Sequence, residues 1–179
     1  MMNLVFLVNH WDLRLLFAIN GHHNFVLDYL MFFVSLLGEF GALWVILAFI
    51  ILFTNKKNGR RALFLILAAL LLTLILNDSI LRVLIHRTRP FLAIPWLHHF
   101  GFSWDNSSFV SGHTATATAA SVVIGHFYKK CRFLLAIFVA LTMYSRVYLG
   151  MHYPSDVLGG LVLGLISGWL ILNIFDKKQ

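Results

Sequence analysis

The sequence predicts an all-α fold, an integral membrane bundle of five or six transmembrane helices that forms one domain over residues 1–179. Of the 179 residues, 60% are hydrophobic and 12% are charged, and the mean hydropathy is +0.83, whereas soluble domains are closer to half apolar. The apolar runs are continuous, unlike the alternating strands of a membrane barrel. A soluble class is therefore excluded, and the net charge of +7 indicates membrane topology rather than a nucleic-acid partner.

A helix needs about 20 mainly apolar residues to cross a bilayer. The clearest candidates are residues 62–81, 134–149 and 157–175. Residues 114–128 form a shorter segment than these candidates and are rich in Ala and Thr. Because small residues allow close helix packing in membranes, we expect this segment to be a helix buried against the others.

The N-terminal segments are less regular. Residues 25–53 form one long apolar stretch that Gly38-Glu39-Phe40-Gly41 interrupts, which predicts a kinked span or a short helix followed by a span. In residues 4–20, Asp12 and Arg14 interrupt the apolar pattern. This segment therefore either lies in the membrane interface as an amphipathic helix or makes a tilted sixth span.

Short basic segments predict the orientation of the helices, because Lys and Arg concentrate in cytoplasmic loops. The three groups are Lys56, Lys57, Arg60 and Arg61; Lys129, Lys130 and Arg132; and Lys177 and Lys178. If all three are cytoplasmic, the helices alternate without contradiction. The opposite helix ends then meet at the outer membrane face.

Polar clusters in the C-terminal half fall at that outer face. They are Arg82-x6-Arg89-Pro90, Ser111-Gly112-His113 and Ser145-Arg146-x5-His152-x3-Asp156. Charged groups are costly near membrane depth, so those that are retained are candidate functional groups. Together the clusters supply three arginines, two histidines and a carboxylate, which are the groups needed to hold and attack a phosphate.

Two of the clusters each suggest a specific chemical role. Ser111 is a good N-cap, and Gly112 would let an anion approach the unpaired N–H groups of a helix N-terminus. Pro154 suits the first turn of a helix, so His152 can fold back onto Asp156. A carboxylate bonded to one ring nitrogen leaves the other free to act as a nucleophile. Taken singly, these two clusters are better explained by helix capping, with His152 as an interfacial histidine.

The arginines strengthen the phosphate hypothesis. Arg82, Arg89 and Arg146 can form forked, charge-assisted bonds with phosphate. No excess of carboxylates accompanies them in the sequence, so we expect them to require an anionic partner. For Arg87 the sequence indicates only solvation or contact with lipid headgroups.

In order and spacing, the three clusters resemble the signature of the type 2 phosphatidic acid phosphatase superfamily. That signature reads Lys-x6-Arg-Pro, Pro-Ser-Gly-His and Ser-Arg-x5-His-x3-Asp, and the resemblance covers about residues 80–160. Arg82 stands where the family has lysine, and Val110 stands where it has proline. Neither departure removes a reacting group.

The resemblance implies roles for the matching residues. His152 would be the nucleophile that forms a phosphohistidine, Asp156 would orient it, and His113 would protonate the leaving oxygen. The phosphate would be held by Arg82, Arg89, Ser111, Gly112 and Arg146. No cofactor or metal site is expected, since the adjacent pairs His22-His23 and His98-His99 suit a single metal ion poorly.

The implied function is metal-independent hydrolysis of a phosphomonoester or pyrophosphate on a membrane lipid. Lipid A 1-phosphate is the favoured substrate, with undecaprenyl pyrophosphate, phosphatidylglycerol phosphate and phosphatidic acid as alternatives. The expected location is a bacterial inner membrane, with the site facing the periplasm. A lipid phosphotransferase and a non-enzymatic lipid-binding bundle are competing hypotheses, and the latter would need neither an acid nor a nucleophile. The oligomeric state is left open.

Overall fold

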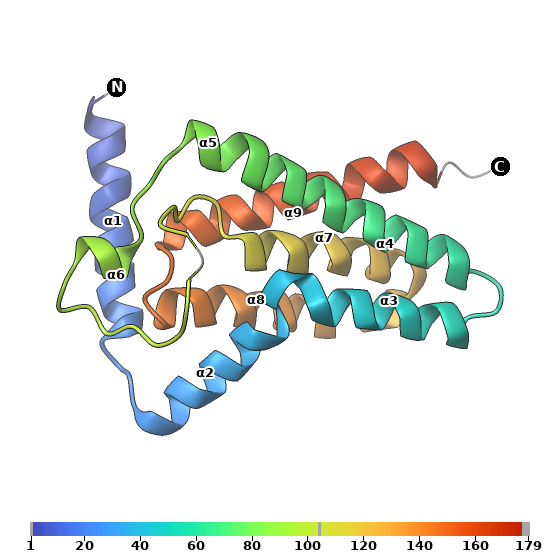
Figure 1. Cartoon of the computed structure of the whole chain (residues 1–179), viewed down its shortest axis with the longest axis horizontal. Helices are drawn as coiled ribbons and strands as arrows, with labels where there is room; N and C mark the ends of the chain where they lie inside the picture. The colour runs from blue at the N-terminus through green and yellow to red at the C-terminus, as the bar shows by residue number, and fades with distance from the viewer. Residues whose placement is uncertain (1, 104, 177–179) are drawn as a thin grey trace.

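The computed structural model describes residues 2–103 and 105–176, and over these residues it is helical, with one isolated bridge between Thr88 and Ser107. This confirms the all-α prediction (Figure 1). The α-helices are α1 (Met2–Asn20), α2 (Phe25–Leu37), α3 (Ala42–Thr54), α4 (Gly59–Leu74), α5 (Arg82–Leu84), α6 (Pro90–Ala93), α7 (Gly112–Phe127), α8 (Arg132–Tyr148) and α9 (Pro154–Phe175). Shorter elements are the 3-10 turns η1 (Glu39–Gly41) and η3 (Lys129–Cys131) and the π-helix η2 (Ile75–Leu81).

Helix α7 forms the centre of the bundle and packs most closely on α9. Gly160, Gly164 and Gly168 recur every fourth residue on α9 and face α7. A Cβ atom added at Gly164 would lie 2.4 Å from the carbonyl oxygen of Ala115, so only glycine permits this backbone approach. The expectation that residues 114–128 form a helix buried through small side chains is confirmed.

Among the described residues, three helical segments are long and apolar enough to cross a membrane: Gly59–Leu84, Lys129–Tyr148 and Pro154–Phe175. The first is continuous through α4, η2 and α5. Helices α2 and α3 meet at a bend of 55° and would count as a fourth, broken span. The bend lies at η1, where Gly41 has a φ of 72°, a conformation suited to glycine. The kink is therefore confirmed, while a total of five or six spans stays a prediction.

The ends of the helices divide into two groups. The basic segments at residues 56–61 and 129–132 lie at one end of the bundle, and the polar clusters lie at the other (Figure 1). Lys177 and Lys178 lie outside the described residues. Helix α1 crosses the polar end of the bundle near α8 and α9, an arrangement that favours an interfacial helix over a sixth span.

Candidate active site

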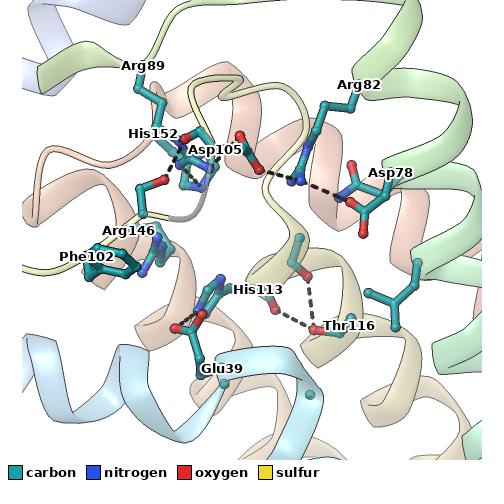
Figure 2. Close-up of a pocket in the computed structure, with 16 residues that line it drawn as sticks. Glu39, Asp78, Arg82, Arg89, Phe102, Asp105, His113, Thr116, Arg146 and His152 are labelled. Atoms are coloured by element: carbon teal, nitrogen blue, oxygen red, sulfur yellow. Dashed lines mark hydrogen bonds and ion pairs between the residues drawn. The ribbon is translucent and has the colours of Figure 1, made fainter. Parts of the chain in front are cut away.

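A cavity of about 130 Å³ opens at the polar end of the bundle. Figure 2 shows its lining residues, which come from η1, from the continuous helix α4–η2–α5, from α7 and α8, and from the loops before α6, α7 and α9. Six of the eight predicted site residues contribute to the lining: Arg82, Arg89, Gly112, His113, Arg146 and His152. Segments separated by more than 60 residues thus converge on one polar cavity.

His152 lies in the loop between α8 and α9 and is 2% exposed. Its Nδ1 donates to the carbonyl oxygen of Ser108 at 2.8 Å, and its Nε2 lies 3.1 Å from Nη1 of Arg89. Burial lowers the pKa of His152 to about 3; Asp156 opposes this effect, and the positive charges of Arg89 and Arg146 add to it. The imidazole is therefore neutral at neutral pH, with the lone pair of Nε2 directed at the arginine side of the cavity.

Asp156 is fully buried behind His152, outside the lining of the cavity. Its Oδ2 lies 3.8 Å from Nδ1 of His152 and accepts a bond of 2.8 Å from the backbone N–H of Tyr153, which caps α9. The carboxylate therefore interacts with the imidazole electrostatically, whereas the hydrogen bond that Nδ1 donates goes to the carbonyl oxygen of Ser108.

Arg87 holds Asp156 from the other side. Its Nη1 donates to Oδ1 of Asp156 at 2.7 Å, and its Nη2 donates to Asp12 of α1 at 2.6 Å. The guanidinium also lies 3.9 Å from the ring centroid of Tyr153. Asp12 in turn accepts a 2.8 Å bond from the backbone N–H of Ser155. The expectation that Arg87 is only solvated or in contact with headgroups is wrong, because it links two buried carboxylates.

The three predicted phosphate-binding arginines have different partners. Arg89 is 5% exposed and is fixed by the carbonyl oxygens of Asp105 at 2.8 Å and Met151 at 3.1 Å. Arg146 is equally buried and donates to the hydroxyl of Ser35, while its Nε has no hydrogen-bond partner within residues 2–103 and 105–176. Both guanidinium groups are held rigidly beside His152.

Carboxylates do accompany these arginines, contrary to the sequence-based expectation. Oδ2 of Asp105 accepts a 2.6 Å bond from Arg82, and its Oδ1 lies 3.4 Å from Arg89. Asp78 lies 3.2 Å from Arg82 (Figure 2). A carboxylate thus bridges the two arginines, and a phosphate entering between them would have to displace it or share them with it.

The Ser111-Gly112-His113 cluster begins α7 as predicted. Oγ of Ser111 accepts from the backbone N–H of Thr114 at 3.5 Å, and the side chain is fully buried behind the cavity lining. A Cβ atom at Gly112 would meet Nδ2 of Asn77 at 3.2 Å. Gly112 therefore leaves room for the cavity at the N-terminus of α7, where backbone N–H groups attract anions.

His113 has a partner that the sequence motifs do not contain. Its Nε2 lies 3.1 Å from Oε2 of Glu39 (Figure 2), which belongs to η1 between α2 and α3. Glu39 interrupts a long apolar stretch, and this isolated charge was the signal that could have identified it. The contact pairs the second histidine of the cavity with a carboxylate from the opposite wall.

The π-helix η2 supplies a further wall of the cavity. It ends at Leu81, directly before Arg82, and carries Asn77 and Asp78. Short π-helical segments often occur at functional sites. Asn77 is 1% exposed, and in the part of the chain that the structure describes its Oδ1 has no hydrogen-bond partner. This oxygen is therefore available to a donor that enters with a ligand.

A membrane helix bundle that presents three guanidinium groups and two distinct histidines in one cavity has the features of an enzyme of phosphoryl transfer. The guanidinium groups can neutralise a phosphate, the neutral imidazole can attack it, and the carboxylate-paired imidazole can supply a proton.

Comparison with known proteins places the chain in a family. A model of the PAP2 superfamily matches residues 61–179, and the chain belongs to this superfamily. It is 34% identical over 161 residues to undecaprenyl-diphosphatase BcrC of Bacillus subtilis, covering 89% of this chain and 81% of that protein. It is 28% identical over 173 residues to a lipid A 4'-phosphatase of Porphyromonas gingivalis, and the match covers 90% of this chain and 72% of that protein. The crystal structure of Aquifex aeolicus LpxE matches with a TM-score of 0.79 and 28% identity, covering 90% of this chain and 94% of that one.

These matches confirm the resemblance seen in the motifs, and they extend it beyond residues 80–160. The chain is a membrane-embedded enzyme of the lipid phosphatase class. The sequence prediction of the enzyme class is therefore confirmed.

Proposed function

We propose that the chain hydrolyses a phosphate from a membrane lipid through a phosphohistidine formed on Nε2 of His152. The observation that carries this proposal is the fixed tautomer of His152. Because Nδ1 donates to Ser108, the proton is on Nδ1, and Nε2 accepts from Nη1 of Arg89 at 3.1 Å. A phosphate that takes over this Arg89 donor would leave the lone pair of Nε2 facing the phosphorus atom. A neutral, oriented imidazole needs no further activation to attack phosphorus.

The remaining side chains suit the two half-reactions. In the first, Nε2 bonds to phosphorus, the bond from phosphorus to the lipid oxygen breaks, and His113 gives its proton to that oxygen. In the second, a water molecule loses a proton to His113 as it attacks phosphorus, the bond to Nε2 breaks, and inorganic phosphate leaves. Burial lowers the pKa of His113 to about 4. The carboxylate of Glu39, 3.1 Å from Nε2 of His113, opposes this effect and favours the protonated imidazole that begins the cycle.

Binding of the phosphate would rest on Arg89 and Arg146, with Arg82 and the N-terminus of α7 completing the contact. The buried arginines provide fixed donors that need no rearrangement as charge develops. Asp156 would stabilise the imidazole from behind at 3.8 Å, and Ser111 would act by capping α7 rather than by touching the phosphate. None of these roles requires a metal ion.

The substrate we propose is a phosphorylated lipid of the bacterial cell envelope. The relative named undecaprenyl-diphosphatase supports an undecaprenyl pyrophosphate substrate, and the relative named lipid A 4'-phosphatase supports a lipid A phosphate. Lipid A 1-phosphate, the substrate favoured in the sequence analysis, stays a third candidate. With the basic helix ends cytoplasmic, the cavity would open to the periplasmic face of the inner membrane.

The test is a panel of these lipids and phosphatidylglycerol phosphate, incubated in detergent with the purified protein and a chelator. We expect phosphate release from at least one lipid and a loss of at least about 10⁴-fold in kcat for His152→Ala. Phosphohistidine should be trapped by acid-free quenching with radiolabelled substrate. Full activity of a folded His152→Ala protein would contradict the mechanism.

A phosphotransferase would use the same first half-reaction and pass the phosphoryl group to a lipid hydroxyl instead of water. Repeating the assay with an acceptor lipid separates the two outcomes. Faster turnover with a phosphorylated acceptor as product would identify the transferase, whereas inorganic phosphate as the product in both assays would identify the hydrolase.

A further inference from the structure

A second group of ligand-type side chains lies at the same end of the bundle, outside the lining of the catalytic cavity. It consists of His23 in the turn between α1 and α2, Asp28 in the first turn of α2, and His98 in the loop after α6. One potential ligand atom from each residue lies within 4.8 Å of the other two. The group takes one histidine from the pair His22-His23 and one from the pair His98-His99. Its ligands therefore come from separate segments, whereas the sequence excluded only a metal ion held by two adjacent histidines.

Two of the three residues, Asp28 and His98, are held in place by the surrounding fold. Oδ1 of Asp28 accepts a 2.7 Å bond from the hydroxyl of Tyr148 at the end of α8. Asn20 donates to the backbone oxygen of His98 at 2.7 Å. This support resembles the outer hydrogen bonds that orient metal ligands in proteins. Asp28 is 8% exposed, so its free oxygen, Oδ2, is presented in a defined direction.

The unsatisfied chemistry of the group points to a cation. Nε2 of His98 is buried and has no hydrogen-bond partner among the described residues, although it lies 3.2 Å from Oδ2 of Asp28. The rings of His23 and His98 stack with centroids 3.9 Å apart and an interplanar angle of 12°. Two imidazoles and one carboxylate with ligand atoms within 4.8 Å of one another form a donor set of the kind that binds zinc.

We propose that His23, Asp28 and His98 bind a divalent cation of the zinc class, with water in the fourth position. Bond lengths of about 2.0–2.2 Å place tetrahedral ligand atoms about 3.3 Å apart. The pair formed by His98 and Asp28 already meets this spacing at 3.2 Å. The side chain of His23 is exposed and can rotate to complete the site.

Such an ion would fasten the loop after α6 to the turn between α1 and α2. The same loop continues to Asp105, whose carboxylate bridges Arg82 and Arg89 at the catalytic cavity. The ion would therefore fix the entrance of the cavity without touching the reacting groups. This assignment is compatible with metal-independent hydrolysis, because none of its three ligands lines the catalytic cavity.

The experiment measures zinc binding by the full chain in detergent, after removal of any affinity tag and of bound metal by a chelator. Competition with a chromogenic chelator should give one zinc ion per chain for the wild type. His23→Ala and His98→Ala should each weaken zinc binding at least about tenfold. Cobalt substitution should add the visible absorption of a tetrahedral Co²⁺ site in the wild type and not in His23→Ala or His98→Ala.

The matched controls are His22→Ala and His99→Ala, which change the other histidine of each adjacent pair. Both should keep the affinity of the wild type. The proposal is overturned if the wild type binds no zinc, or if His22→Ala weakens binding as much as His23→Ala. Since His23 is exposed, its alanine variant should fold, and the zinc-induced rise in melting temperature should be lost in this variant but kept in both controls.

Discussion

The two histidines of the cavity stand in contrasting surroundings. His152 belongs to the α8–α9 side, where Ser108, Asp156, Arg87 and Asp12 form a connected and mostly buried set of contacts. His113 belongs to the α2–α7 side, where one carboxylate from η1 pairs with it across the cavity. The proposed nucleophile therefore depends on a fixed environment, while the proposed proton donor depends on a single, partly exposed partner.

The largest effect that separates the two sides should come from the leaving group. His113→Ala is expected to lower kcat on a phospholipid by about 10²–10⁴-fold, because the lipid alkoxide needs a proton to leave. With p-nitrophenyl phosphate, whose phenolate leaves without a proton, the loss should be much smaller. The measurement is kcat for both substrates.

His152→Ala serves as the control in that experiment, since a nucleophile is needed for either leaving group. Equal losses of His113→Ala on both substrates would show that His113 is needed for binding or folding and would remove its assignment as the acid.

The second prediction concerns the stability of the α8–α9 side. Arg87→Ala is expected to lower the free energy of unfolding by about 3–5 kcal/mol, because it leaves the carboxylates of Asp12 and Asp156 buried without a counter-charge. Chemical denaturation in detergent micelles measures the change. Arg14→Ala, which removes an exposed arginine from the same helix as Asp12, is the matched control and should change stability by less than about 0.5 kcal/mol. An equal effect of both changes would disprove the structural role of Arg87.

The third prediction tests the single partner on the α2–α7 side. Glu39→Gln should lower kcat by about tenfold and shift the basic limb of the pH–rate profile to lower pH, because the carboxylate favours the protonated imidazole of His113. Glu39→Asp should restore part of the activity. An unchanged pH profile in Glu39→Gln would indicate that the contact with His113 is only structural.

The smallest effect should be on the pH dependence of stability. The pKa of His152 is lowered by burial from its ordinary value of 6.5 to about 3, so the folded protein keeps this imidazole neutral while the unfolded chain protonates it. This contribution is fully present above pH 6.5 and is lost as the pH falls from 6.5 toward 3. His152→Asn lacks it, and its melting temperature should therefore fall less over that range than that of the wild type. Parallel curves would contradict the assignment of a neutral imidazole.

The sequence predicted the motif residues well because their chemistry is local. Ser111 caps α7 by accepting from the backbone N–H of Thr114, three residues later in the sequence. Pro154 begins α9 two residues after His152. The small side chains in residues 114–128 likewise indicated close helix packing, and α7 does pack closely against the glycines of α9. Such features follow from short-range spacing and helix periodicity.

The partners of those residues were not predictable in the same way. Arg87 contacts Asp12 across 75 positions, and His113 contacts Glu39 across 74. No spacing rule covers such distances, since they depend on how α1 crosses the bundle end and where η1 bends the chain. For the same reason, the sequence expected unpaired arginines where Asp105 bridges two of them.

By itself, the sequence determined the membrane bundle, the end of the bundle at which the polar clusters meet and the histidines that we propose as reacting groups, because hydropathy, basic loops and motif spacing are properties of the chain. Only the tertiary structure decided which group fixes each histidine, how the arginines are neutralised and that His23 and His98 meet at Asp28. These outcomes depend on contacts between distant segments, and such contacts exist only once the helices have packed.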